Sequence, residues 1–185
     1  PNRGVFNVLS GEVEFDDAYI GATKIGSKRG RGTSKAPFVV AVELGKKGGC
    51  CLRATGDLKA VSYKAFAHDH ICKNSHIRTD DFPSLKCGLA TWPGLDAQKF
   101  DAVGEESALR HVHNIISNLK SYIIGTYHGV HREYLQSYLD EFQYRYCKRH
   151  DRGIFTTLIA DMCRGKTPRA QLIELFATQE IQAAA

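Results

Sequence analysis

Two aspartates, Asp16 and Asp80, stand where their carboxylates could bind divalent metal ions. Asp16 lies between apolar residues in the middle of an expected strand, GEVEFDDAYIG (11–21), and Asp80 directly follows a short expected strand at 75–79. Phosphodiester chemistry with two metals needs carboxylates that converge on ions roughly 4 Å apart, and Mg²⁺ prefers hard oxygen ligands. Two acids far apart in the sequence could therefore meet at the end of a sheet. An aspartate after a strand is also common as a turn residue or helix cap.

The strands that would carry these acids are predicted by hydrophobic patterning. In 11–21, Val13 and Phe15 alternate with acids, so we expect a strand with one face exposed to solvent. The segment FVVAVEL (38–44) is apolar and β-branched, typical of a central strand buried on both faces. Residues 50–55 then predict a third strand and a three-stranded meander.

The rest of the chain is mostly helical in pattern. A helix is expected from Leu58 to about His70 with Asp57 as its N-cap, then a short helical turn at 82–85 and one short strand around 87–91. Apolar residues at three- and four-residue steps predict further helices at 107–124, 132–147, 154–163 and 169–178, with 125–129 breaking the first. This order predicts an α/β layer with a mixed central sheet and helices around it. We expect one domain over 1–150, with 151–185 as its helical extension.

Net charge is +5 and the isoelectric point is near 8.9, which favours a polyanionic partner. The basic residues gather in two groups, each of which could also be a solvated loop or helix end. Together the groups favour phosphate contacts. The members are Lys24, Lys28, Arg29, Arg31 and Lys35 in the first group, and Arg145, Lys148, Arg149 and Arg152 in the second.

Composition excludes several other classes. No apolar run approaches the roughly 18 residues of a membrane span, so no membrane partner is expected. The six cysteines form no C-x-x-C pair, and we expect free thiols in a reducing compartment. The eight histidines form no zinc pattern and are expected at the surface.

Six segments carry a family resemblance: GEVEFDDAYIG, GSKRGRG, FVVAVEL, HIRTDDF, HNIISNLKSYIIGTYHGV and YLQSYLDEFQYRY follow in this order. Together they resemble the insertion-sequence transposases whose core carries Asp, Asp, then Asn or Glu, then Lys. The resemblance runs from Gly11 to Lys148, and ISNLK with GTYHGV and YLDEF is its most specific part. It implies a ribonuclease H-like fold, a mixed five-stranded sheet flanked by helices, in which the strands of Asp16 and Asp80 are neighbours.

The resemblance also implies an activity. Such a domain binds two divalent ions, Mg²⁺ or Mn²⁺, cleaves at the element's ends and joins the freed 3′-hydroxyl to target DNA. Double-stranded DNA, as element ends and as target, is then the expected partner, in the bacterial cytoplasm at the nucleoid, with a homo-oligomer as the usual assembly. Two other functions stay open: an inactive DNA-binding module of the same fold, and a ribonuclease H-like nuclease without joining activity.

Carried over by position, Asp16 and Asp80 match the family's first and second acids, and Asn118 and Lys120 match the third and fourth positions. The metal ligands would then be Asp16, Asp80 and Asn118. Asn118 has no charge and is a weaker ligand than Glu. Lys120 lies roughly 200° around the helix from it, so both cannot point straight at one ion, and Lys120 could instead contact a phosphate.

Three other residues are alternatives for the third ligand. His113 and Asn114 lie one helical turn before Asn118, and Glu141 is a charged candidate from the next helix. Glu141 could equally be a surface acid or form an ion pair with Arg145 at i+4.

Overall fold

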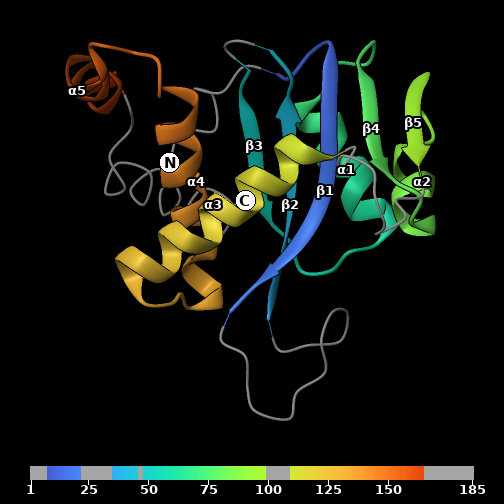
Figure 1. The fold of residues 1–185 in the computed structure, drawn as a ribbon, viewed down its shortest axis with the longest axis horizontal. Coiled ribbons are helices and arrows are strands. Elements are labelled where there is room, and N and C mark those ends of the chain that lie inside the picture. The colour runs from blue at the N-terminus through green and yellow to red at the C-terminus, as the bar shows by residue number, and fades with distance from the viewer. Residues whose placement is uncertain (1–7, 22–34, 46–47, 99–108, 165–185) are drawn as a thin grey trace, which may run out of the picture. The chain divides into compact units, whose positions relative to one another are not determined.

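Five strands form one mixed sheet in the order β3-β2-β1-β4-β5 (Figure 1). The structure, a computed structural model, describes residues 8–21, 35–45, 48–98 and 109–164. The first three strands form an antiparallel meander, β4 runs parallel to β1, and β5 runs parallel to β4. The strands are β1 (Glu12–Ile20), β2 (Ala36–Glu43), β3 (Cys50–Ala54), β4 (His76–Asp80) and β5 (Gly94–Gln98).

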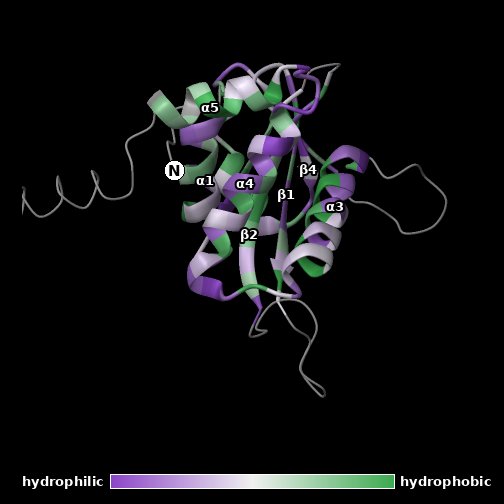
Figure 2. Cartoon of the chain, turned by 90° about the vertical axis from the view of Figure 1, so that its left-hand side faces the viewer, coloured by the Kyte–Doolittle hydropathy of each residue, from purple (hydrophilic) through white to green (hydrophobic). Residues whose placement is uncertain are grey.

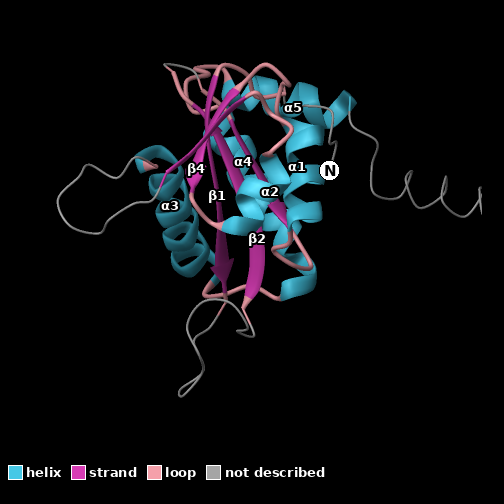
Figure 3. Cartoon of the chain, turned by 90° about the vertical axis from the view of Figure 1, so that its right-hand side faces the viewer, coloured by secondary structure: helices cyan, strands magenta, loops and turns pink. Residues whose placement is uncertain are grey.

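Helices cover both faces of this sheet (Figure 3). The helices α1 and α2 pack on one face, and α3 and α4 on the other. The predicted ribonuclease H-like α/β fold, its meander and the pairing of β1 with β4 are thereby confirmed. The bounds are α1 (Ala60–His70), α2 (Pro83–Leu89), α3 (Arg110–Tyr127), the 3-10 turn η1 (Arg132–Tyr134) and α4 (Leu135–Cys147).

Two compact units divide the chain, one of residues Asn7–Cys147 and one of Pro1–Phe6 with Lys148–Ala185. The first unit contains the sheet and all of the helices named so far. The second contains α5 (Ile154–Arg164), where Asp151 accepts hydrogen bonds from the Gly153 N–H and the Thr157 hydroxyl. Across the described residues, no helix is long and apolar enough to cross a membrane.

The central strands are buried from both sides, as expected for β2 but not for β1. On β1, Val13 and Phe15 face the α1 layer, and Ala18 and Ile20 face the α3 layer. The expectation that one face of this strand is exposed is wrong, because α3 covers it, and Glu14 is only 1% exposed. Figure 2 shows hydrophobic and hydrophilic residues along α3, as expected for a helix with one buried side.

The strand expected around 87–91 is also wrong. Residues up to Leu89 belong to α2, and the strand comes later, at Gly94–Gln98. Pro83 at the start of α2 has a φ suited to a first helical turn. Leu85 and Leu89 lie one turn apart and are both buried.

Two helix ends differ from expectation. The helix expected at 107–124 begins at Arg110 and continues through Gly125 to Tyr127. It ends where His128 takes a left-handed φ of 55° and its N–H donates a hydrogen bond to the Ile124 carbonyl.

The start of α1 also differs from expectation, because its N-cap is Lys59 and not Asp57. The Asp57 carboxylate instead accepts hydrogen bonds from the Lys59 N–H and the Ser62 hydroxyl. The helix expected at 169–178 lies outside the described residues.

The outer edge of β3 is paired with side chains of α4. Alternate N–H groups of an edge strand point outward, and here those of Leu52 and Ala54 bond Gln143 Oε1 at 2.7 Å and Gln136 Oε1 at 2.8 Å. The Cys50 N–H meets the Cys147 sulfur at 3.5 Å. All six cysteines are free thiols, as expected.

Candidate active site

Asp16 and Asp80 lie on neighbouring strands and face the same side of the sheet. Glu14 of β1 pairs with Arg78 of parallel β4, and the same register continued by two residues sets Asp16 opposite Asp80. Both side chains therefore point toward the α3 layer, since side chains two residues apart share a face. Asp80 also accepts a hydrogen bond from the Phe82 N–H at 3.1 Å, which holds the turn after β4.

Asp17 belongs to the opposite face. Its carboxylate accepts a hydrogen bond at 2.8 Å from the hydroxyl of Tyr63, a fully buried residue of α1. Its N–H donates to Asp16 Oδ1 at 2.8 Å. Of the two consecutive acids of β1, only Asp16 therefore faces the side shared with Asp80.

His113 of α3 meets Asp16 directly. Its Nε2 lies 3.3 Å from Asp16 Oδ2, with the imidazole half-exposed and the carboxylate 16% exposed. The hydrogen bond to Asp16 raises the pKa of His113 above its ordinary value. Partial burial opposes this, and the charges of Asp16, Glu14 and Asp80 add to the increase. Asp16 and Asp80 are therefore both close enough to His113 for their charges to raise its pKa.

Glu14 fixes the start of α3 to β1. Its Oε2 accepts a hydrogen bond from the Val112 N–H at 2.8 Å, and its Oε1 lies 2.9 Å from His111 Nδ1. Sequence reasoning missed this residue because it expected that face of β1 to be solvated. The signal was available: Glu14 shares its face with Asp16, two residues on. His111 and His113 are exposed, as expected for surface histidines, and both also contact acids of β1.

Of the four residues carried over from the family, the two on α3, Asn118 and Lys120, lie on different sides of this helix. His113 and Lys120 lie within about 20° of each other around the helix, whereas Asn118 is about 140° from His113. Lys120 is half-buried near Asp16 and Lys35, and burial, with the repulsion of Lys35, lowers the pKa of Lys120. Asn118 is exposed.

The remaining candidates lie elsewhere. Asn114 is exposed. Glu141 accepts a hydrogen bond from the Tyr127 hydroxyl and forms the expected i+4 ion pair with Arg145, at 2.9 Å. Of the expected DNA contacts, Lys35 lies in the first unit near Lys120. Lys148 and Arg149 belong to the second unit, whereas Lys28, Arg29 and Arg31 lie outside the described residues.

The donor set suits a hard divalent ion that keeps part of its water. Among the described residues, no group of three or more His, Cys, Asp or Glu side chains is arranged to hold a metal ion. Two carboxylates on one face, Asp16 and Asp80, are nonetheless what Mg²⁺ commonly uses together with substrate phosphate and water. The two carboxylates would suit such an ion, and His113 is the side chain beside Asp16.

A comparison with protein-family models gave a match over most of the chain. One family model, described as the ISXO2-like transposase domain, matches residues 8–146, about three quarters of the chain. The matched range falls within the first compact unit, Asn7–Cys147. A comparison with curated protein sequences gave no significant match.

Proposed function

The chain belongs to the ISXO2-like transposase family, and on this premise we propose that it cuts and joins DNA strands at the carboxylates of Asp16 and Asp80. The observation that carries the proposal is their placement. Both acids face the α3 layer from neighbouring parallel strands, and His113 closes over Asp16 at 3.3 Å. Element ends would be the first substrate and target DNA the second.

The protein residues would divide the work. Asp16 and Asp80 would bind divalent ions, Mg²⁺ or Mn²⁺, which when bound would offset phosphate charge and activate the attacking oxygen. Lys120 would bind a phosphate of the same strand. Glu14 would act as a positioning residue, because its bond to the Val112 N–H sets where α3 begins over β1.

For the third position we propose His113 in place of Asn118. His113 shares a helix face with Lys120 and contacts Asp16, whereas Asn118 is on an exposed side. A neutral imidazole nitrogen can bind a metal. It would first have to give up the proton that it shares with Asp16.

Nicking of supercoiled plasmid in Mg²⁺ or Mn²⁺ tests cleavage without knowledge of the end sequence. Joining would be measured with labelled duplexes that carry any inverted repeats found on either side of the gene. We expect Asp16→Asn and Asp80→Asn to lose more than about 100-fold, beyond the 10–100-fold typical of residues that only support a ligand. Glu133→Gln, an exposed acid of η1, is the control and should stay within about twofold. Wild-type nicking by Asp16→Asn would refute the proposal.

Substitutions of His113 and Asn118 test which of the two occupies the third ligand position. We expect His113→Ala to lose activity strongly and His113→Glu to retain or raise it in Mg²⁺, because a carboxylate is a harder ligand. Asn118→Ala should stay near wild type. If Asn118→Ala loses as much activity as His113→Ala, Asn118 belongs to the site and the proposal for His113 is wrong.

A second candidate function is a DNA-binding module that has lost the chemistry. The observation favouring it is that, among the described residues, no three His, Cys, Asp or Glu side chains are arranged to hold a metal ion. Salt-sensitive DNA binding with no nicking in either metal would support this candidate, and nicking without joining would support a nuclease.

A further inference from the structure

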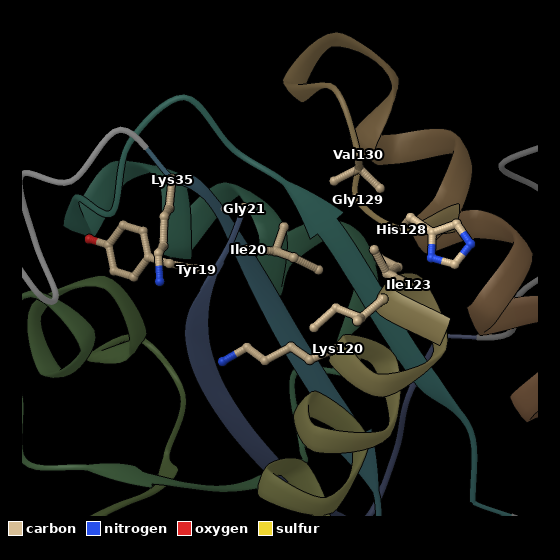
Figure 4. Close-up of a pocket in the computed structure, with 10 residues that line it drawn as sticks. Tyr19, Ile20, Gly21, Lys35, Lys120, Ile123, His128, Gly129 and Val130 are labelled. Carbon is tan, nitrogen blue, oxygen red and sulfur yellow. The ribbon is translucent and has the colours of Figure 1, made fainter. Parts of the chain in front are cut away.

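A cleft of about 360 Å³ lies between the end of β1, the start of β2 and the last turns of α3 (Figure 4). Gly21 and Lys35, which adjoin these strand ends, approach closely: a Cβ at Gly21 would be 3.5 Å from the Lys35 Cα. The cleft is lined by Tyr19, Ile20, Lys120, Ile123, Ile124 and Val130, together with the left-handed turn at His128 and Gly129.

The lining separates into an apolar part and a cationic part. Ile20, Ile123 and Val130 lie toward one end, next to His128, whereas the amino groups of Lys35 and Lys120 lie at the other end with Tyr19 (Figure 4). A ligand that fits both parts has an apolar body and a negative charge. A volume of this size is at the small end of ligand pockets, which suits a single nucleotide.

The two lysines favour an anion between them. Lys120 is half-buried, and its pKa is lowered by burial and by the nearby charge of Lys35. Two ammonium groups that repel each other are stabilised when a phosphate binds to both. The charge of Asp16 also reaches Lys120, so a phosphate held here would neighbour the acidic site.

The cleft lies further along both β1 and α3 than the acidic site. Ile20 follows Asp16 by four residues on the same strand face, a distance of about 13 Å. Lys120 follows His113 by two helical turns, about 10 Å. A strand whose phosphate lies at Asp16 could therefore place a neighbouring nucleotide at the cleft.

We propose that this cleft binds one unpaired base of the DNA, withdrawn from its stack, while Lys35 and Lys120 bind the adjoining phosphate. The inference rests on the proposed function, because it takes the strand at Asp16 to be DNA. Extraction of a base from a duplex costs a few kcal/mol and is cheapest where the base is already unpaired. The cleft would thus select frayed or processed ends over intact duplex.

Binding in EDTA tests the cleft without any cleavage. The probes are two fluorescein-labelled duplexes with the same unpaired 3′ extension, one with bases and one with abasic sugar-phosphates. We expect the wild-type chain to bind the first at least about fivefold more tightly, the lower end of the effect of one stacked base. Equal binding of both probes would overturn the inference.

Variants locate the effect. Val130→Trp fills the apolar part of the cleft and leaves both lysines in place. Ile124→Trp has the same purpose and is the second variant in case the first does not fold, because Ile124 is 66% exposed. Both should abolish the preference for bases. Val61→Trp, on α1 at 79% exposure, is the matched control and should keep it. A preference that survives both cleft variants would refute the site.

Two lysine substitutions, one in the cleft and one outside it, distinguish the phosphate contact from the base contact. Lys35→Gln should weaken both probes alike, whereas Lys64→Gln, an exposed lysine of α1, should weaken neither. If Lys35→Gln binds both probes like wild type, the phosphate contact is wrong.

Plasmid nicking, measured in parallel, separates this inference from the proposed function. Nicking without a base preference overturns the cleft and leaves the function standing. A base preference lost in the cleft variants, but without nicking, supports the base site and counts against the catalytic proposal.

Discussion

Glu14 Oε2 accepts a hydrogen bond from the Val112 N–H at 2.8 Å, in a place where the glutamate is 1% exposed. The first N–H groups of a helix have no partner within the helix, and a negative charge there is favoured by the helix dipole. Glu14 therefore supplies a hydrogen-bond acceptor to the first turn of α3. It fixes that turn to β1 at a point two residues before Asp16.

Glu14→Leu should destabilise the fold by about 1–3 kcal/mol, because it leaves the buried Val112 N–H without a partner. Urea denaturation would measure the loss, with Glu133→Gln as an exposed control. If Glu14→Leu unfolds at the same urea concentration as this control, the bond contributes nothing to stability.

The pairing of His113 with Asp16 should make stability depend on pH. The folded pKa of His113 is raised, so its contribution is fully present below the unfolded value of about 6.5 and is lost as pH rises through the folded pKa. The difference in unfolding free energy between wild type and His113→Ala should therefore be larger at pH 5.5 than at pH 9. Because the imidazole is half-exposed, solvent screens the effect and it should be modest.

A titration by nuclear magnetic resonance checks the cause. Asp16→Asn should bring the pKa of His113 down toward its ordinary value, whereas Asn118→Asp, on another side of α3, should have a smaller effect. An unchanged His113 titration in Asp16→Asn would contradict the assignment.

Gln143→Leu should cost about 1–3 kcal/mol, because the Leu52 N–H loses its acceptor in a buried position. Hydrogen exchange gives a local measurement: the Leu52 amide should exchange faster, while the Val112 amide on α3 should change less. Ser137→Ala, at an exposed position of α4, is the control. Unchanged protection of Leu52 would show that the bond does not hold the edge.

Cys51 should react far more slowly than the exposed thiols. Burial raises its pKa to about 12, so almost none of it is thiolate at pH 8, and thiolate is the reactive form. Iodoacetamide labelling followed by mass mapping should modify exposed Cys72 and Cys87 first. Labelling of Cys51 at a comparable rate in the folded protein would contradict this burial.

The sheet was largely predictable because its signals are local. The apolar run of β2 and the alternation of Val13 and Phe15 with acids in β1 predict strands, and α3 and α4 show helical spacing. The short strand β5 was not predictable: GLDAQ has no alternation, and its place depends on pairing with β4. The burial of Glu14 likewise depends on α3, nearly a hundred residues later in the chain.

The residues of the candidate site also differ in whether local sequence signals predict them. Asp16 and Asp80 could be chosen from sequence because each lies in or directly after a strand. The residue of α3 that meets them depends on the rotation of that helix, which is set by the packing of Val112, Ile115 and Leu119. The family resemblance favoured Asn118 and left His113 as an alternative, whereas in the packed helix it is His113 that contacts Asp16.

The pairing of α4 with β3 has a consequence for how molecules of this chain can associate. An unpaired edge invites a strand from another molecule to add to the sheet. At β3 the outward N–H groups of Cys50, Leu52 and Ala54 already meet side chains of α4. This edge is therefore closed to intermolecular strand addition, and a chain that loses Gln143 would be open to aggregation there as well as less stable.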